Sequence, residues 1–295
     1  MRLVLVVGVV VVVVLAAHPA HATYSIVATD TATRQVGGAV TSCVGTLSVS
    51  IVYGGVPGKG AVHAQAQLGG PGKNAAVMQL GMDVDPAAII TSITATAFDA
   101  NAQRRQYGIV DLMARSAGFT GTQTSPFTDD RQAQIGTYTY SVQGNILTSA
   151  AVLDQAAASF QTQGCDLADK LMLALEAGAQ NGEGDSRCTG SGIPSDSAFL
   201  EVDREGEAAG TYLRLDVTNT SPQSPLVLLR AQYDAWRVTH PCPAPPMPDA
   251  GAGGDGGIDD MSDDGGGCCS GSGDSNSWPL VLVVGVLRRR SRART

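Results

Sequence analysis

Groups of strand-like segments alternate with helix-like segments along residues 23–240, and this order restricts the folds open to the chain. Strands are indicated where β-branched and aromatic residues gather, and helices where apolar residues recur every three or four positions. The expected strands are residues 24–30, 36–42, 48–53, 61–67, 106–111, 113–119, 138–144, 197–203 and 212–217. The expected helices are residues 74–81, one opened by Asp85-Pro86, one with Leu153, Ala157 and Phe160 on a face, one with Leu167, Leu171 and Leu175, and one from Leu226 to Trp236. This order favours an α+β domain with stacked sheets and outer helices.

Two local signals add detail. Asp85 can cap a helix whose first residue is Pro86, because proline is tolerated at that position and the aspartate accepts a backbone hydrogen bond. Gly37 and Gly38 fall inside an expected strand, where the missing side chains indicate close approach by a neighbouring element.

The N-terminal segment predicts export. Arg2 supplies a positive start, Leu3 to Ala17 is an unbroken apolar run, and Ala20-His21-Ala22 places small residues where a signal peptidase reads them. We therefore expect a signal peptide over residues 1–22 and a mature protein that begins at Thr23. An uncleaved membrane anchor is the alternative, but the apolar run is shorter than the ~20 residues of a spanning helix.

The rest of the chain divides by composition. Residues 23–240 suffice for a single domain with one sizeable core. Residues 241–277 are rich in proline, glycine and aspartate, which predicts a disordered linker. The aspartates there lack the ordered spacing of a calcium loop, so a solvated spacer is the favoured interpretation. Residues 278–295 combine a short apolar run with an arginine cluster.

Charge and residue types exclude several classes of function. The formal net charge of −8 argues against a nucleic-acid partner, which requires a basic surface. The mature chain would retain two histidines, His63 and His240, and no Cys-x-x-Cys pair occurs, so a zinc site is not indicated. Gly69 to Lys73 has a superficial likeness to a phosphate loop, but Gln67 replaces its first glycine and Asn74 its magnesium-binding Ser/Thr. We expect no metal and no cofactor, and nothing indicates an oligomeric state.

Cysteines suggest a disulfide framework. Six are present, at positions 43, 165, 188, 242, 268 and 269, and export would permit bridges. Cys165 and Cys188 flank an expected helix and a loop and are the first pair that we expect to be bridged. Cys43 and Cys242 are the second.

Thr23 is the main candidate catalytic residue. Signal-peptide cleavage would give it a free α-amine, which titrates near ~7.7–8.0 and is therefore partly a neutral base at neutral pH. Because the amine lies beside the residue's own hydroxyl, it can accept the Oγ1 proton, and one residue then supplies both nucleophile and base. The alternative is that Thr23 is an ordinary small residue at the start of a secreted chain.

Several segments resemble one family. The opening Thr23-Tyr-Ser-Ile-Val-Ala-Thr-Asp30 is similar to the start of members of domain-of-unknown-function family 1028, a bacterial and archaeal family with an N-terminal-nucleophile (Ntn) hydrolase-like fold. Further similar segments follow in order: Val36–Ser42, Gly60–Gln65, Gly108–Asp111, Tyr140–Asn145 and Gly184–Arg187. The likeness runs from Thr23 to about Arg237 and implies a four-layer αββα sandwich.

Within this resemblance, Ser42 and Asn145 are candidates to orient the nucleophile or to stabilise an oxyanion, since an amide donor can stabilise a tetrahedral oxyanion. Strand-end hydrogen bonding and turn formation are their alternative roles. Asp185 and Arg187 are expected to form an ion pair near the sheet edge, with a structural role.

The chain departs from the family in two places. Proteasome-like relatives keep a lysine near the nucleophile, whereas Lys59 and Lys73 lie here in glycine-rich turns and Arg34 is a further candidate cation. Leu68 to Asn74 replaces an Asn-Pro-x-Tyr-Gly-x-Arg-Gly stretch that relatives tend to carry.

The C-terminal end resembles the sorting tails of myxobacterial surface proteins, in which a Gly-Cys site is processed ahead of an apolar run and arginines. Gly267-Cys268 and the tandem Cys269 are the matching residues, so we expect Cys268 or Cys269 to be an attachment point. A frayed end without an anchoring role is the alternative.

Two functional hypotheses follow. The first is an exported, surface-displayed Ntn-type amide-bond hydrolase that uses Thr23, with a cell-wall or peptide-like substrate. The second is a non-catalytic surface or cell-wall binding domain with the same fold.

Overall fold

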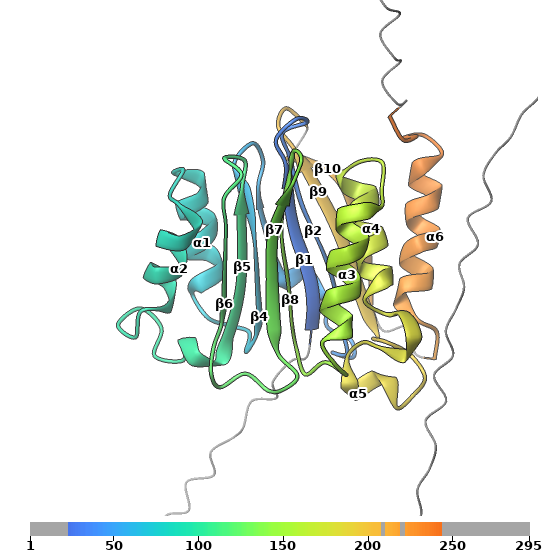
Figure 1. Cartoon of the computed structure of the whole chain (residues 1–295), viewed down its shortest axis with the longest axis horizontal. Coiled ribbons are helices and arrows are strands. Elements are labelled where there is room, and N and C mark those ends of the chain that lie inside the picture. The colour runs from blue at the N-terminus through green and yellow to red at the C-terminus, as the bar shows by residue number, and fades with distance from the viewer. Residues whose placement is uncertain (1–22, 208–209, 219–221, 244–295) are drawn as a thin grey trace, which may run out of the picture. The chain divides into compact units, whose positions relative to one another are not determined.

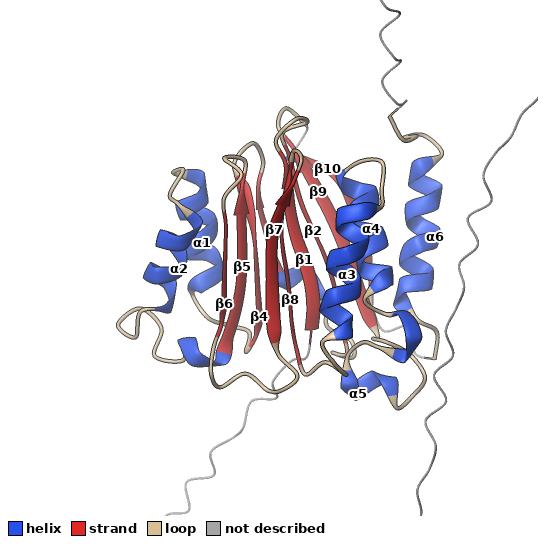
Figure 2. Cartoon of the chain, in the orientation of Figure 1, coloured by secondary structure: helices blue, strands red, loops and turns tan. Residues whose placement is uncertain are grey.

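The computed structural model describes residues 23–207, 210–218 and 222–243, which form two antiparallel sheets with helices beside them (Figures 1 and 2). The strands are β1 (Thr23–Asp30), β2 (Gln35–Ser42), β3 (Tyr53–Val56), β4 (Gly60–Ala66), β5 (Arg105–Asp111), β6 (Ser116–Thr120), β7 (Asp129–Ile135), β8 (Tyr138–Asn145), β9 (Ser197–Arg204) and β10 (Thr211–Val217). The α-helices are α1 (Gly72–Gly81), α2 (Pro86–Thr94), α3 (Ala151–Thr162), α4 (Leu167–Ala177), α5 (Ser186–Thr189) and α6 (Pro225–Arg237). The α+β class expected from the sequence is confirmed.

The two sheets face each other and carry helices on their outer sides (Figure 1). The larger sheet has the strand order β10-β9-β2-β1-β8-β7, and the smaller has the order β3-β4-β5-β6. Helices α3, α4 and α6 pack on the larger sheet, whereas α1 and α2 pack on the smaller one. This layering places β1, the strand that begins at Thr23, in the interior of the domain.

The burial of β1 follows from its two covered faces. All eight of its residues are buried, as expected for a strand between two layers. Ile26 packs in the core beneath α3 and α4, whereas the next residue, Val27, packs in the core between the sheets, because successive side chains of a strand point to opposite faces. Burying such a side chain contributes about 1.5–3 kcal/mol.

Gly37 and Gly38 in β2 confirm the close approach that their sequence position indicated. A Cβ atom at Gly37 would lie 2.9 Å from Leu171 of α4, and one at Gly38 would lie 2.4 Å from Nε2 of His63 in β4. The two glycines therefore let α4 and the smaller sheet close on opposite faces of β2.

The Asp85-Pro86 signal is also confirmed. Pro86 is the first residue of α2, and Oδ1 of Asp85 accepts a hydrogen bond from the Ala87 N–H at 2.8 Å.

Three elements differ from expectation. Residues 49–52 form a 3₁₀ helix where a strand was expected, and β3 follows it. Strand β7 was missed because its sequence Asp-Asp-Arg-Gln-Ala-Gln-Ile is polar; it lies at the edge of the larger sheet, where none of its residues is fully buried. The short helix α5 was also missed, since four residues carry no apolar period.

The expected disulfide pairs Cys165–Cys188 and Cys43–Cys242 are wrong: the structure joins Cys43 to Cys188 and Cys165 to Cys242. Helix α4 separates Cys165 from Cys188, and its 11 residues carry the chain about 16 Å away. The end of α6 returns to the start of α4, where Arg237 donates to Oδ2 of Asp166 at 2.8 Å, and this return brings Cys242 to Cys165.

No helix within the described ranges is long and apolar enough to cross a membrane. The expected signal peptide (residues 1–22), most of the linker, Cys268, Cys269 and the arginine-rich end lie outside the described residues.

Candidate functional site

The three candidate catalytic residues meet at one end of the larger sheet. Thr23 is the first residue of β1; it pairs on one side with Ser42, the last residue of β2, and on the other with Asn145, the last residue of β8. Antiparallel pairing produces this meeting, because the start of a strand lies opposite the ends of both neighbours. The Thr23 Oγ1 atom lies 3.1 Å from the Ser42 Oγ atom, within hydrogen-bond distance.

Asn145 has unused hydrogen-bonding capacity. Its side chain is fully buried, its Nδ2 donates to Oε1 of Gln106 at 3.3 Å, and its Oδ1 has no partner in the described chain. A side-chain amide offers two N–H donors, so one donor is left after the bond to Gln106. A buried polar group in this state is suited to interact with a bound ligand.

Two glutamines that the sequence analysis did not single out support Thr23 from the facing sheet. Gln65 of β4 donates from Nε2 to the Thr23 carbonyl at 3.3 Å and to Oε1 of Gln106 at 2.8 Å. Gln106 of β5 donates in turn to the Gly144 carbonyl of β8 at 3.0 Å. Both are almost fully buried, which makes a connected polar layer between the sheets. A sequence signal was present, since Gln65 closes the family-like segment Gly60–Gln65.

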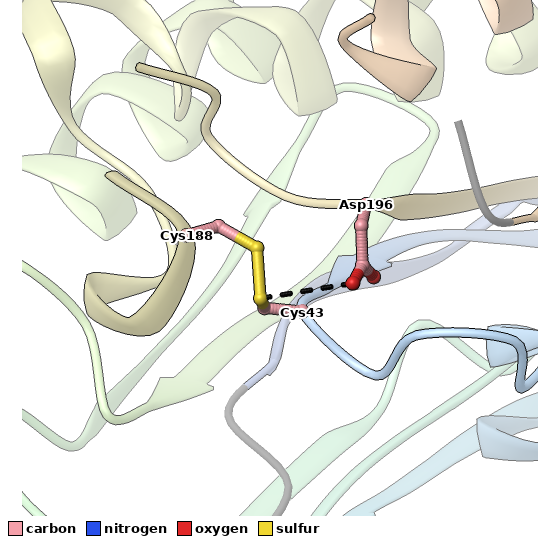
Figure 3. A group of neighbouring side chains, drawn as sticks. All are labelled: Cys43, Cys188 and Asp196. Atoms are coloured by element: carbon pink, nitrogen blue, oxygen red, sulfur yellow. Dashed lines mark hydrogen bonds between the residues drawn. A yellow bond between two sulfur atoms is a disulfide. The ribbon is translucent and has the colours of Figure 1, made fainter. Parts of the chain in front are cut away.

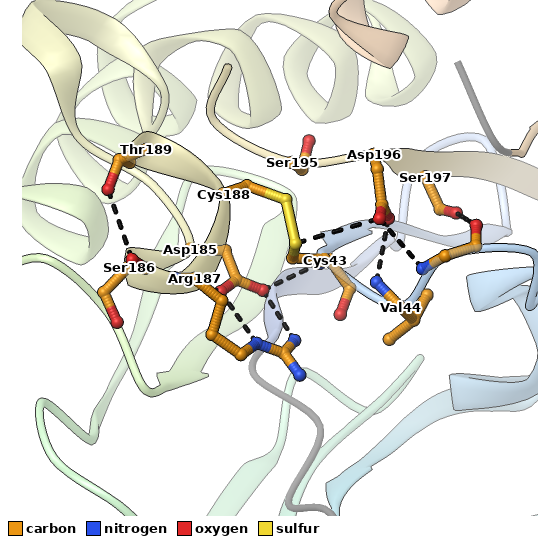
Figure 4. Close-up of a disulfide and its surroundings, with 12 residues drawn as sticks. Cys43, Val44, Asp185, Ser186, Arg187, Cys188, Thr189, Ser195, Asp196 and Ser197 are labelled. Carbon is orange, nitrogen blue, oxygen red and sulfur yellow. Dashed lines mark hydrogen bonds and ion pairs between the residues drawn. A yellow bond between two sulfur atoms is a disulfide. The ribbon is translucent and has the colours of Figure 1, made fainter. Parts of the chain in front are cut away.

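An ion pair stands at the same strand end. Asp185 is fully buried, and its Oδ2 accepts hydrogen bonds from the Cys43 N–H at 2.7 Å and from Nη2 of Arg187 at 2.8 Å (Figure 4). Cys43 directly follows Ser42, so the Asp185–Arg187 pair lies beside the position where β2 meets Thr23. The ion pair expected between these residues is present.

The Cys43–Cys188 disulfide lies near Asp196, and the three side chains form a cluster of potential metal ligands (Figure 3). Thiolates are the sulfur species that bind metals, and these two sulfurs are bonded to each other. The Asp196 carboxylate accepts hydrogen bonds from the backbone of Val44 and Gly45, each at 2.8 Å. The cluster therefore fixes the loop after β2 and does not hold a metal in this oxidised state.

The cations proposed from the sequence bind elsewhere. Arg34 pairs with Glu205 and Lys59 with Asp83, and both lie in turns at the far end of their strands from Thr23. Lys73 donates to the carbonyls of Ile51 and Tyr53, and Lys170 to those of Phe160 and Gln163. None of the chain's three lysines makes a hydrogen bond to Thr23 within the described part of the chain.

These features define a class of two-sheet α+β domain with a threonine, a serine and an asparagine at one strand register. The chain belongs to the family of unknown function DUF1028, whose model matches residues 23–226. Its fold is similar to the crystal structure of protein SPO2555 from Silicibacter pomeroyi, of the same family designation, with a TM-score of 0.60, 20% identity, and coverage of 73% of this chain and 89% of that chain. No curated protein matches the chain.

Proposed function

We propose that this chain is an exported Ntn-type hydrolase that cleaves an amide bond with Thr23 as both nucleophile and base. The observation that carries the proposal is the strand register, which sets Thr23 between Ser42 and Asn145. The layering of helices, two sheets and helices supports the assignment of an Ntn-hydrolase-like αββα sandwich.

The proposed reaction begins at the α-amine that signal-peptide cleavage would expose. The neutral amine takes the Oγ1 proton while Oγ1 attacks the carbonyl carbon of the substrate amide. The resulting tetrahedral oxyanion receives a hydrogen bond from the remaining Nδ2 donor of Asn145. When this intermediate collapses, the C–N bond breaks, the ammonium returns its proton to the leaving amine, and an ester on Thr23 remains. Water then hydrolyses the ester and restores the hydroxyl.

Ser42 and the Asp185–Arg187 pair would prepare this residue. The 3.1 Å contact between the two hydroxyls limits the positions that Oγ1 can take. Arg187 forms an ion pair with Asp185 beside this strand end, and because the two charges balance, the pair would order the end of β2 without supplying the free cation that proteasome-like relatives carry as a lysine. Asp185 and the neighbouring disulfide hold that guanidinium in place.

The first test is the mature N-terminus together with a variant series. We expect N-terminal sequencing of the secreted protein to begin at Thr23. An electrophile directed at N-terminal nucleophiles should label the wild type, fail to label Thr23→Ala, and label Thr23→Ser, which keeps both amine and hydroxyl. Thr31→Ala, in the turn at the other end of β1, is the matched control and should label like the wild type. A chain that starts at Ala20 or keeps Met1 would rule out the proposed base.

A non-catalytic surface or cell-wall binding domain is the second candidate function. The positions of the lysines favour this candidate. Each lysine is bonded away from Thr23 in the described structure, so none of them is placed to keep the Thr23 amine neutral. Absence of labelling in a chain that correctly begins at Thr23 would support this candidate over the hydrolase.

Surface display through the C-terminal tail completes the proposal. The two disulfides are compatible with an oxidising compartment outside the cytosol. Attachment at Cys268 or Cys269 would retain the domain at the outer surface, close to a cell-wall or peptide-like substrate.

A further inference from the structure

A pocket lies where the loop after β4 leads into α1, on the opposite side of the smaller sheet from β1. Its volume is about 350 Å³, and Gln67, Gly70, Lys73, Arg105 and Tyr107 are among its lining residues. This volume falls within the range of about 300–1,000 Å³ typical of small-molecule sites. No acidic residue is among the described residues that line it, although the chain as a whole is acidic.

Tyr107 presents an unpaired donor to this pocket. The residue is only 2% exposed, and its hydroxyl forms no hydrogen bond with any part of the chain that the structure describes. Burial raises the pKa of Tyr107 to about 12, which keeps the hydroxyl protonated and able to donate. A Cβ at Gly72 would lie 2.1 Å from the Tyr107 oxygen, so the glycine at the start of α1 leaves room for this hydroxyl.

Two cations, Lys73 and Arg105, line the same pocket as the hydroxyl. The Lys73 ammonium donates to the carbonyls of Ile51 at 2.6 Å and Tyr53 at 3.2 Å, which leaves one of its three protons for a ligand. Arg105 is held by Asp99 through Nε at 2.8 Å and by the Leu68 carbonyl through Nη1 at 3.0 Å. Its Nη2 forms no hydrogen bond within the described chain and therefore stays available.

The loop between β4 and α1 also favours an anionic ligand in this pocket. A Cβ at Gly70 would lie 2.6 Å from Nη2 of Arg105, so the guanidinium packs directly against the loop backbone. Pro71 precedes α1 without a side-chain cap, and the first N–H groups of an uncapped helix carry partial positive charge. Gln67 adds a buried Oε1 that no described residue satisfies, which suits an N–H donor on the ligand.

We propose that this pocket binds the carboxylate of a peptide-like ligand. The carboxylate lies against Tyr107, Lys73 and Arg105, and an amide N–H of the same ligand donates to Gln67. The inference rests on the pocket alone and does not depend on Thr23 being a nucleophile.

The test is calorimetric titration of the mature protein with N-acetylglycine, which carries one carboxylate and one amide. We expect saturable binding that is absent for the neutral N-acetylglycinamide. Tyr107→Phe removes only the hydroxyl and should weaken binding about tenfold, the size of one hydrogen bond to a charged group. Lys73→Met should weaken it by about the same factor, whereas the matched control Lys59→Met, whose lysine pairs with Asp83 away from this pocket, should bind like the wild type.

Chemical shifts of the wild type provide a readout that needs no variant. N-acetylglycine should shift the amide resonances of Gly70 and Gly72, and saturable shifts confined to other regions would overturn the proposal. If N-acetylglycinamide binds as tightly as N-acetylglycine, the pocket is not an anion site. If inorganic phosphate binds and N-acetylglycine does not, the carboxylate assignment is overturned. Thr23→Ala should bind N-acetylglycine like the wild type, so that failure of this site and failure of the hydrolase proposal can be distinguished.

Discussion

His63 shows how strongly the interior of this domain disfavours charge. It lies fully buried between the sheets, its ring contacts Tyr53 edge-on, and neither ring nitrogen has a partner in the described structure. Burial, with a smaller effect from Lys73, lowers the pKa of His63 to about 3. The residue is therefore neutral in the folded protein at every physiological pH.

This shift predicts acid sensitivity. The unfolded state takes up the histidine proton near pH ~6.5, whereas the folded state does not until about pH 3, so the His63 contribution to stability is lost as pH falls below about 6.5. The loss should approach about 1.4 kcal/mol per pH unit. Urea unfolding at pH 7.5 and pH 4.5 should show a smaller stability change for His63→Leu than for the wild type. An equal change in both proteins would contradict a buried neutral His63.

Glu201 and Asp203 change the stability of the protein with pH in the opposite direction to His63. The effect of His63 is therefore isolated only by comparing the wild type with His63→Leu. Burial and the neighbouring Asp203 carboxylate raise the pKa of Glu201 to about 7, against a smaller opposing effect of Arg214. The folded state then binds this proton more tightly than the unfolded state, so the Glu201 contribution is lost as pH rises toward 7. This contribution is common to the wild type and His63→Leu and cancels in their difference.

At the residue scale, the sequence singled out more of the candidate site than of the residues around it. Thr23, Ser42 and Asn145 were identified from a cleavage position and a family resemblance, and the structure brings all three together. Gln65 and Gln106 were not identified, because their importance depends on two strands of different sheets facing each other. Contact between strands of different sheets leaves no periodic pattern in the local sequence.

At the scale of elements, local sequence signals predicted the position of a helix or strand well where its hydrophobic or capping pattern is regular. Helix α2 starts at its expected proline, and β1 and β2 match their expected strands closely because their apolar residues are covered on both faces. Strand β7 could not be predicted from hydrophobic pattern, since an edge strand is held by backbone pairing to β8 while its polar side chains reach solvent. The predicted disulfide pairing was also wrong, because the pairing depends on where α4 and α6 end in space.

The two disulfides should differ in their effect on the site. The Cys43–Cys188 bridge spans 145 residues and joins the residue after β2 to α5 beside Asp185, whereas Cys165–Cys242 spans 77 residues and joins the loop before α4 to the segment after α6. Replacing either pair with serine should lower the free energy of unfolding by about 2–5 kcal/mol. Only the Cys43/Cys188 double variant should also lose electrophile labelling at Thr23. Equal labelling in both folded variants would show that this bridge does not hold the site.

At the scale of the whole molecule, the proposed role of Thr23 depends on export. Thr23 can act as an N-terminal nucleophile only when the bond before it has been cut, so secretion and activation would be one event. Pairing of β1 with β2 and β8 would then keep the new terminus between Ser42 and Asn145.

Retention at the surface would depend on the C-terminal cysteines. Replacing Cys268 and Cys269 together with serine should release the domain into the medium, since an apolar run of about ten residues is too short to span a bilayer and retention then needs a covalent attachment. Fractionation followed by immunoblotting measures the change, with Cys165→Ser/Cys242→Ser as a control for loss of a different cysteine pair. Retention of the Cys268/Cys269 variant at the surface would contradict an anchoring role.

The role of Thr23 as nucleophile and base is tested by the mass of the N-terminal peptide after the mature protein reacts with a β-lactone. We expect one adduct, an ester on Thr23 Oγ1, and we expect prior acetylation of the α-amine to abolish it, because acetylation removes the base and leaves the hydroxyl untouched. An adduct that persists after acetylation, or no adduct at all in a folded chain beginning at Thr23, would contradict the proposed role of Thr23.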